Sequence, residues 1–278
     1  MEAGENMIEC SNIHFQYHNK KSSFKIDDIS LRIESGYFTC LLGHNGAGKT
    51  TLLKLIYGMI MPESGTVAFD GETISYEKQY EGKEIEASGI PIGYGREELS
   101  LKNLDTYHRI CAYIGEEWCI PFLSVKDNVD TFSVLYPDFD WRLYGSLLKK
   151  LDFNEPDTLY FRLSTGQQMK VQLCFQLARR PKYIILDEPL ANLDVVAKRD
   201  IIEVLQQGIK EWDMGVIMST HLLDEISDVV DYIAVMEEGR LCEYGERDEI
   251  FAKHDTDSLR DVMKETGEET GDGSLSPQ

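Results

Sequence analysis

The sequence predicts an α/β fold with a mostly parallel sheet, and two observations carry that prediction. Between residues 183 and 236, short apolar runs of strand type alternate with helical segments, as they do in sheets covered by helices. Near the N-terminus, an apolar run at 37–42 passes through a glycine-rich stretch into a helical segment at 51–57. The chain has 278 residues, of which 42% are hydrophobic, so one or two domains with a substantial core are expected.

The first third of the chain predicts strands flanking this glycine-rich stretch. Residues 8–15 and 29–33 alternate apolar with polar side chains, and residues 66–69 form a further run that closes on the turn pair Asp70 and Gly71. Residues 72–107 are charged, punctuated by glycine and weakly periodic. We interpret 72–107 as a surface insertion, which either is neutral or contacts a specific partner.

The middle of the chain predicts a group of helices after a strand at 109–114. Ser124 followed by Asp127 resembles a capping box and begins a helix toward Leu135. Further helices are expected at 140–151 and at 165–179, the latter stopping before Pro181.

The last third predicts strands at 183–186, 216–219 and 232–236 and helices at 195–211 and 222–228. The final residues, 265–278, are rich in Gly, Glu and Ser, which predicts a disordered tail. Residues 1–264 then form a single domain.

Charge and composition exclude several classes of function. The formal net charge is −21, and a chain this acidic is expected to repel nucleic acid. The six cysteines show no metal-binding spacing and are expected to be reduced thiols of a cytosolic protein. The N-terminus does not resemble a signal peptide, and no apolar run approaches the roughly 18 residues of a membrane span.

The glycine-rich stretch fits the phosphate-binding pattern G-x-x-x-x-G-K-(S/T). Its residues are Gly43, His44, Asn45, Gly46, Ala47, Gly48, Lys49 and Thr50, and Thr51 follows. Glycines allow successive backbone N–H groups to turn toward phosphate oxygens, and the helix that follows adds its positive N-terminal end. The pattern predicts an ATP-binding loop in which Lys49 reaches the β- and γ-phosphates and the Thr50 hydroxyl ligates Mg²⁺.

Two carboxylates, Asp187 and Glu188, follow the apolar strand at 183–186. By themselves, two acids after a strand more often form a solvated turn. The carboxyl ends of the strands line the ligand crevice of an open α/β sheet. Because a phosphate-binding loop precedes these acids in the chain, we interpret them as part of the nucleotide site and not as a solvated turn. Asp187 is then placed to hold Mg²⁺, and Glu188 to polarise the water that attacks the γ-phosphate.

A third motif narrows the class. Residues 163–167 read Leu-Ser-Thr-Gly-Gln, about twenty residues before Asp187. By itself this is an ordinary Ser-capped helix start. In this order, the sequence resembles the ATP-binding cassette (ABC) ATPase family, whose signature is Leu-Ser-Gly-Gly-Gln. Thr165 departs from it at the third position.

More of the pattern of this family follows in order. Residues 191–194, ending in Asp194, resemble its D-loop, and His221 lies where the family places a histidine that contacts the γ-phosphate. Tyr17 resembles the aromatic residue that stacks on adenine, although Phe15 and His14 are alternatives nearby.

The resemblance, over roughly residues 7–245, implies a P-loop ATPase core, an antiparallel β subdomain at the N-terminus and an inserted α-helical subdomain at about 120–180. It also implies that two cassettes close head to tail around two ATP molecules. Ser164, Gly166 and Gln167 would then bind ATP held by the other cassette, with Asp194 nearby. The second cassette is either a copy of this chain or a related subunit.

One departure from the family concerns its Q-loop, where residues 113–116 read Tyr-Ile-Gly-Glu instead of ending in Gln. Glu116 is therefore the expected ligand of ATP and Mg²⁺ at this position. A similar stretch at 92–97 is rejected, because residues 124–129 follow the later site at the distance typical of the family. Glu116 and the segment 135–140 resemble a bacterial exporter-type branch, some members of which act on peptides or in antibiotic response.

The resemblance implies the motor subunit of a transporter, peripheral on the cytoplasmic face of the membrane. An integral membrane subunit is expected to dock near residues 116–123, where Trp118, Pro121 and Phe122 are either anchors or core residues. A non-transport ABC ATPase, for example of the Fe–S assembly type, is an alternative. An inactive regulatory cassette is a third, which the intact Lys49 and Glu188 oppose.

Overall fold

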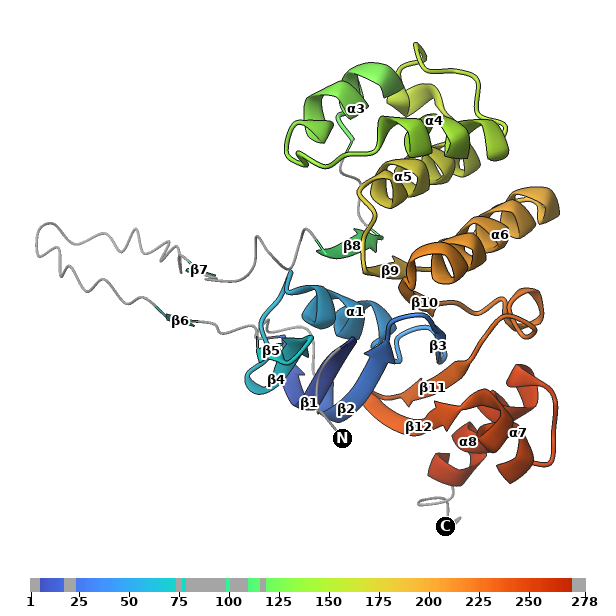
Figure 1. Cartoon of the computed structure of the whole chain (residues 1–278). Coiled ribbons are helices and arrows are strands. Elements are labelled where there is room, and N and C mark those ends of the chain that lie inside the picture. Colours follow the sequence, from blue (N-terminus) through green and yellow to red (C-terminus); the bar gives the residue numbers. More distant parts are fainter. Residues whose placement is uncertain are drawn as a thin grey trace, which may run out of the picture.

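The computed structural model describes residues 6–17, 24–73, 77–78, 99–100, 110–115 and 119–271. Its largest sheet has six strands in the order β12-β11-β3-β10-β9-β8 (Figure 1). The bounds are β3 Phe38–Leu42, β8 Cys111–Ile114, β9 Tyr183–Asp187, β10 Gly215–Ser219, β11 Tyr232–Glu237 and β12 Arg240–Glu246. Every neighbouring pair is parallel except β11 with β12, so the predicted α/β class with a mostly parallel sheet is confirmed.

A second, antiparallel sheet forms the N-terminal part, as expected, in the order β2-β1-β4-β5. The bounds are β1 Met7–Gln16, β2 Lys25–Glu34, β4 Ser64–Phe69 and β5 Glu72–Thr73. The helix α1, Lys49–Tyr57, shares one hydrophobic core with this sheet and with one face of the six-stranded sheet. The phosphate-binding loop before α1 is therefore held between two layers.

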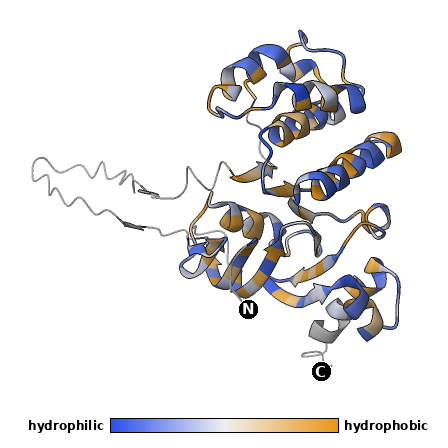
Figure 2. Ribbon diagram, viewed as in Figure 1, coloured by the Kyte–Doolittle hydropathy of each residue, from blue (hydrophilic) through white to orange (hydrophobic). Residues whose placement is uncertain are grey.

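The central strands are buried on both faces, which explains their uninterrupted apolar sequence. All five residues of β3 are buried, with Phe38, Cys40 and Leu42 in one core cluster and Leu41 in the other. Figure 2 shows these central strands as mainly hydrophobic, whereas hydrophobic and hydrophilic residues alternate along the helix α6, Val195–Trp212.

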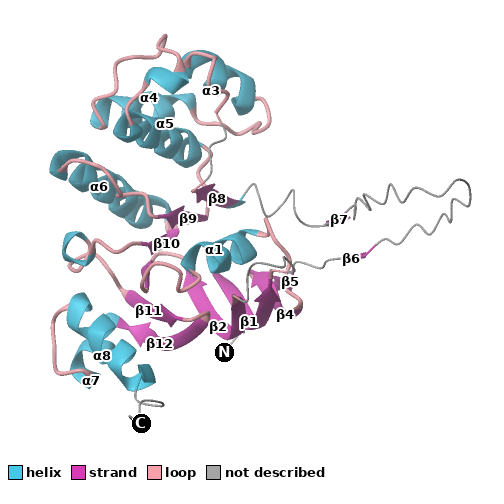
Figure 3. Cartoon of the chain, turned by 180° about the vertical axis from the view of Figure 1, so that it is seen from behind, coloured by secondary structure: helices cyan, strands magenta, loops and turns pink. Residues whose placement is uncertain are grey.

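The predicted helical subdomain is a separate layer beyond the edge strand β8, seen from both sides in Figures 1 and 3. It contains α3 Val125–Ser133, α4 Trp141–Lys150 and α5 Thr165–Ala178. Ser124 is the N-cap of α3, since its Oγ accepts from the Asp127 N–H at 3.0 Å. The Asp127 carboxylate accepts from the Ser124 hydroxyl at 2.7 Å and not from the Ser124 backbone N–H, so the cap forms without the reciprocal bond of the predicted capping box.

The C-terminal region was predicted least well. The helix expected at 222–228 is only a short 3₁₀ turn, Leu223–Glu225, and β12 and the helix α7, Arg247–Lys253, were not predicted. The prediction of a disordered tail from residue 265 was also wrong in part, because α8 runs from Leu259 to Gly271. Leu259 and Val262 pack in the core and Thr266 is buried, which holds the helix in place. Residues 272–278 lie outside the described residues.

The segment 72–107 is described only at β5, β6 (Glu77–Lys78) and β7 (Leu99–Ser100), of which the last two pair antiparallel. The rest of the expected insertion lies outside the described residues. Among the residues that are described, no helix has both the length and the apolar character needed to span a bilayer.

Candidate active site

The glycine-rich loop joins β3 to α1 and has glycines where side chains would clash. Gly48 has φ +109°, and a Cβ there would lie 2.6 Å from the Phe24 ring. A side chain is also excluded at Gly43, since a Cβ there would collide with the Met236 carbonyl oxygen. The loop is cross-linked by the Ala47 N–H, which donates to the His44 carbonyl at 3.1 Å. Its backbone is therefore fixed in a conformation that only glycine permits at these points.

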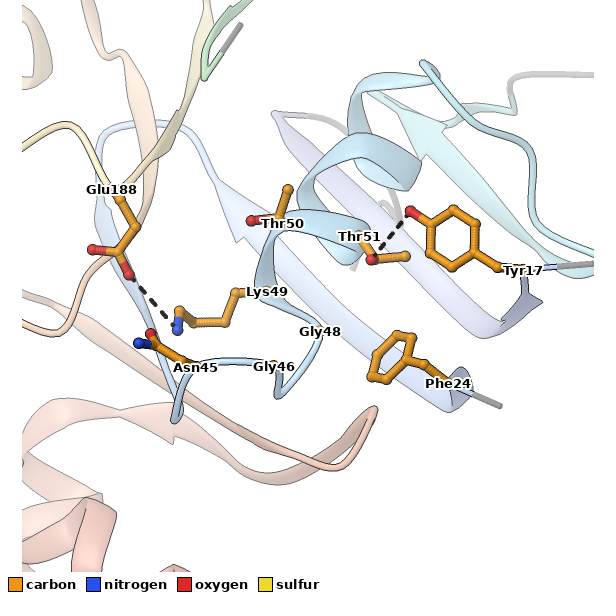
Figure 4. A pocket seen from close by; sticks show the side chains of 9 residues that line it. All are labelled: Tyr17, Phe24, Asn45, Gly46, Gly48, Lys49, Thr50, Thr51 and Glu188. Atoms are coloured by element: carbon orange, nitrogen blue, oxygen red, sulfur yellow. Dashed lines mark hydrogen bonds and ion pairs between the residues drawn. The ribbon is translucent and has the colours of Figure 1, made fainter. Parts of the chain in front are cut away.

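Lys49 is the first residue of α1 and is only 6% exposed. Its Nζ donates to the Gly43 carbonyl at 2.7 Å and lies 3.7 Å from Oε1 of Glu188 (Figure 4). A buried ammonium is costly unless it is paired, and here it is held by a backbone carbonyl and faced by a carboxylate. The loop therefore presents a positive charge to the pocket.

That pocket has a volume of about 350 Å³. It is lined by Tyr17, Phe24, Asn45, Gly46, Gly48, Lys49, Thr50, Thr51 and Glu188. The Tyr17 hydroxyl lies 3.4 Å from Oγ1 of Thr51, and Figure 4 shows both aromatic rings on one side of the loop with Glu188 on the other.

Phe24 was not predicted as a site residue. The strand was expected to begin at residue 29, so Phe24 fell in a presumed loop, whereas β2 begins at Lys25.

The two acids after the apolar strand are positioned by the neighbouring strand β10. Ser219 Oγ donates to Asp187 Oδ1 at 2.7 Å and accepts from the Glu188 N–H at 3.0 Å. Glu188 has φ +50°, a left-handed conformation that is uncommon for a side chain of this kind. One hydroxyl thus fixes both Asp187 and the turn that aims Glu188 into the pocket.

His221 follows β10 and contacts the other carboxylate oxygen. Its Nδ1 lies 2.9 Å from Oε2 of Glu188, and its side chain is 55% exposed. Glu188 therefore stands between Lys49 and His221. Burial raises the pKa of the Cys40 thiol in β3, and the Glu188 charge adds to that effect while the Lys49 charge opposes it, so this thiol stays neutral.

The position expected to be the Q-loop can be located only up to Gly115. A Cβ on Gly115 would lie 2.9 Å from the Cβ of Asp187, so β8 ends directly beside the first acid. Glu116 and Trp118 lie outside the described residues.

The residues of the signature motif do not join this pocket. Ser164 is exposed and caps α5, accepting from the Gln167 N–H at 3.3 Å while its own N–H donates to Gln167 Oε1 at 2.9 Å. The Gln167 amide also donates to Glu155 at 2.7 Å. Asp194 likewise caps α6 by accepting from the Ala197 N–H at 2.9 Å. Gly166 lies against Leu193. These residues are absent from the lining of the pocket among the described residues.

Comparison with known proteins gives a family for this arrangement. Residues 26–191 match the family model described as ABC transporter. The energy-coupling factor transporter ATP-binding protein EcfA1 of Streptococcus sanguinis is 28% identical over 92% of this chain and 84% of its own length. The ABC transporter ATP-binding protein YtrB of Bacillus subtilis is 29% identical over 81% of this chain and 68% of its own.

The fold is similar to that of the ATP-binding cassette MJ0796, solved as a dimer in a post-hydrolysis state with ADP and Pi. The TM-score is 0.70 at 20% identity, covering 86% of this chain and 98% of that one. The family match covers more than half of the chain, including the glycine-rich loop and both acids. The chain is therefore an ATP-binding, ATP-hydrolysing member of the ABC transporter family.

Proposed function

We propose that this chain is the ATPase motor of a transporter whose pathway is formed by a separate membrane subunit. The observation that carries the proposal is the arrangement of Lys49, Glu188 and His221 at one edge of the nucleotide pocket. A positive charge that binds phosphate and a residue that positions the attacking water are groups that ATP hydrolysis uses, and here Lys49 and Glu188 would supply them. His221 would hold the Glu188 carboxylate in place.

The nucleotide would lie along the loop with its base toward the aromatic side. Tyr17 and Phe24 offer ring faces for stacking, and Thr51 hydrogen-bonds the Tyr17 hydroxyl. The loop amides from residues 43–48 and the N-terminal end of α1 would accept the phosphates. The Lys49 ammonium would exchange the Gly43 carbonyl for phosphate oxygens.

The residues present also fit Mg²⁺. The metal prefers oxygen ligands and is usually held by one or two carboxylates or hydroxyls together with the phosphates, whose charge it neutralises. Thr50 is exposed at the start of α1 and lines the pocket, and Asp187 ends the adjacent strand. Among the described residues, no group of three acids, histidines or cysteines forms a metal site of its own. Glu116 directly follows Gly115 and is the remaining candidate ligand.

Glu188 is the proposed base that polarises the attacking water. Its backbone is held by Ser219 and its carboxylate is shared between Lys49 and His221. When Lys49 turns to the phosphates, one oxygen of Glu188 becomes available for water while His221 still orients the other.

A second cassette would supply the missing side of the site. Ser164, Gly166 and Asp194 are outside the pocket, and Ser164 and Asp194 are exposed. In the dimeric cassette named above, two chains bind each other in the presence of nucleotide products. We infer that Ser164 and Gly166, with Gln167 and Asp194 holding the local backbone, complete the pocket of a second copy of this chain.

The membrane subunit is expected to dock on the helical subdomain near residue 122. Phe122 is 77% exposed and Phe161 48% exposed, and their ring centroids are 5.6 Å apart. Exposed paired aromatics of this kind are typical anchors of an interface. Docking there would place the chain on the cytoplasmic face of the membrane as a peripheral subunit.

The direction and cargo form a finer proposal. Glu116 and the segment 135–140 favour export of a peptide or an antimicrobial compound. The similarity to EcfA1 over 92% of the chain favours an energy-coupling factor system instead. In proteoliposomes with this chain and ATP outside, an exporter fills the vesicle lumen with labelled peptide. Release of preloaded cargo from the lumen would support the energy-coupling alternative.

The test of the motor proposal is a pull-down of the tagged chain from native membranes in mild detergent. We expect a polytopic membrane protein in near-stoichiometric amount with the unmodified chain, and much less of it with Phe122→Ser and Phe161→Ser combined. The matched control is Val134→Ser with Leu135→Ser, an apolar pair elsewhere on the same subdomain that is at least as exposed on average, at 76% and 64%. Recovery of soluble partners alone would instead support a non-transport ABC ATPase.

A further inference from the structure

A buried arginine joins the helical subdomain to the nucleotide-binding core. Arg179 caps the C-terminal end of α5 and is only 7% exposed. Its Nη1 donates to Gln176 Oε1, and its Nη2 donates to the Cys111 carbonyl at 3.3 Å. Its Cζ lies 4.0 Å from the centroid of the Tyr136 ring. The guanidinium therefore contacts α5, the first residue of β8 and the loop between α3 and α4.

A fourth element reaches the same point. Burial raises the pKa of Tyr57, and a side-chain hydrogen bond with Arg179 opposes that effect. Tyr57 is the last residue of α1, and its ring packs 5.1 Å from the ring of Tyr113 in β8. The Arg179 side chain thus contacts the C-terminal ends of two helices, α1 and α5, together with the start of β8 and the α3–α4 loop.

Each of the three regular elements carries a motif of the site at its opposite end. α1 begins at Lys49, α5 begins after Ser164, and β8 ends at Ile114, directly before Gly115, which lies against Asp187. A 14-residue helix such as α5 is about 21 Å long at 1.5 Å per residue, so a small tilt at Arg179 displaces Ser164 appreciably. The guanidinium is therefore at the pivot end of the element that carries the signature.

The chemistry at this pivot requires arginine. A planar guanidinium can donate to Gln176, to the Cys111 carbonyl and to Tyr57 while its face covers the Tyr136 ring. A lysine has one compact ammonium and can keep the contact with the ring but not all of these directed bonds. Removing the charge altogether leaves buried acceptors without a donor.

We infer that Arg179 is a positioning residue, which couples the orientation of α5 and its Ser164 motif to the loop of Lys49 and to the end of β8 beside Asp187. The inference rests on the proposed function, in which Ser164 acts on the nucleotide of a second cassette. Arg179 touches none of the reacting groups, so its effect is on closure and turnover and not on the first binding of ATP.

The test compares Arg179→Met and Arg179→Lys with Arg180→Met as the matched control. Arg180 is the next residue, is exposed, and pairs with Asp140 at 3.0 Å at the surface. Three quantities are measured: the Kd for ATP, ATP-dependent dimerisation of the Glu188→Gln chain carrying each variant, and kcat of the chain with Glu188 intact.

We expect Arg179→Met to keep the Kd for ATP within about twofold, since it removes no contact with nucleotide. It should lower kcat about tenfold and raise the ATP concentration needed for dimerisation by a similar factor, as is typical when coupling is disturbed. Arg179→Lys should fall between the parent and Arg179→Met, and Arg180→Met should match the parent. Normal kcat and normal dimerisation in Arg179→Met would overturn the inference.

A purely structural role would lower the melting temperature and the affinity for ATP together with kcat. If Arg179→Met fails to fold, Arg179→Lys and Tyr136→Leu carry the test, because Tyr136→Leu keeps the guanidinium and its hydrogen bonds and removes the loop's ring, which packs on Arg179 and on Phe175. Both should lower kcat at unchanged Kd, and full activity in both would contradict the inference.

Failure of the proposed function would be seen separately, as a Glu188→Gln parent that stays monomeric with ATP. Hydrogen exchange then tests Arg179 by itself. Nucleotide binding should change the exchange of α5 amides in the parent and not in the Arg179 variants, and equal changes in both would overturn the coupling.

Discussion

The loop of Lys49 and the start of α5 at Ser164 are both helix N-termini suited to anions, yet they are built in opposite ways. Lys49 is buried, held by a carbonyl and faced by Glu188. Ser164 is exposed, and its hydrogen bonds are all made within its own first turn. The first region is a prepared pocket, whereas the second is a stable surface with no ligand site of its own.

This difference shows what one chain can and cannot do. The pocket side fixes its charged groups before nucleotide arrives, which lowers the cost of binding and of hydrolysis. The Ser164 side keeps the free N–H groups of a helix start directed outward, where another molecule can reach them. Changes on the pocket side should therefore alter binding or chemistry in a single chain, and changes on the Ser164 side should act only when two chains meet.

The largest effect is expected at the chemical step. Glu188→Gln keeps the shape of the side chain but removes its basicity, and kcat should fall by roughly 10²–10⁴. The Kd for ATP should stay close to that of the parent. Phosphate release is measured alongside nucleotide binding, with Glu203→Gln as a surface control. Near-normal turnover would assign the base to another residue.

A smaller effect is expected on the aromatic side of the same pocket. Tyr17→Ala and Phe24→Ala each remove a ring on which a base can stack, a contact worth about 1–3 kcal/mol. Each should weaken ATP binding about tenfold. Binding of inorganic triphosphate, which has no base, should not change. Loss of affinity for both ligands would mean that the rings support the fold and not the base.

On the Ser164 side, two helix caps provide a matched pair. Ser164 caps α5 and Ser124 caps α3 with the same type of bond. Ser164→Ala and Ser124→Ala should each lower the free energy of unfolding by about 1 kcal/mol. Only Ser164→Ala should also lower kcat, by several-fold, with no change in the Kd for ATP. If both variants lose activity equally, the Ser164 hydroxyl has no role beyond the cap.

The smallest effect lies outside both regions, in the C-terminal helices. Burial lowers the pKa of His254, but hydrogen bonds that its ring donates to the carboxylates of Glu265 and Glu243 outweigh burial and raise the pKa above its usual value. The stabilisation is then fully present below the unfolded pKa of about 6.5 and is lost as pH rises through the folded pKa.

His254→Gln should therefore lower the free energy of unfolding by about 1 kcal/mol at pH 6 and by less at pH 9. Thermal unfolding of the variant and the parent between pH 6 and pH 9 measures the difference in their stability. The Kd for ATP is the control, and it should be unchanged in the variant. A pH-independent difference would contradict the assigned role of the charged histidine.

Much of the pocket side could be predicted because its physics is local in sequence. The loop of residues 43–50 needs glycines at fixed places, and strands buried on both faces show unbroken apolar runs. Phe24 was missed because it lies before a strand whose start was placed four residues too late. Its role depends on the pairing of β2 with β1, which brings it beside Tyr17.

The C-terminal elements were missed for a similar reason. β12 is half-exposed and reads as a mixed polar segment, and it becomes a strand only by pairing with β11. The end of α8 looked disordered because it is rich in Glu and Gly, yet Val262 and Thr266 anchor it in the core. The bond of Gln167 to Glu155 also joins residues from separate elements, which no local motif encodes.

The most direct test of the two-sided site is the mass of the Glu188→Gln chain in solution, measured by light scattering after gel filtration. With ATP and Mg²⁺ the mass should double from one chain to two, and addition of Ser164→Ala should shift that transition to higher ATP concentration while nucleotide affinity stays the same. A chain that remains monomeric when saturated with ATP, or a dimer indifferent to Ser164, would contradict the account.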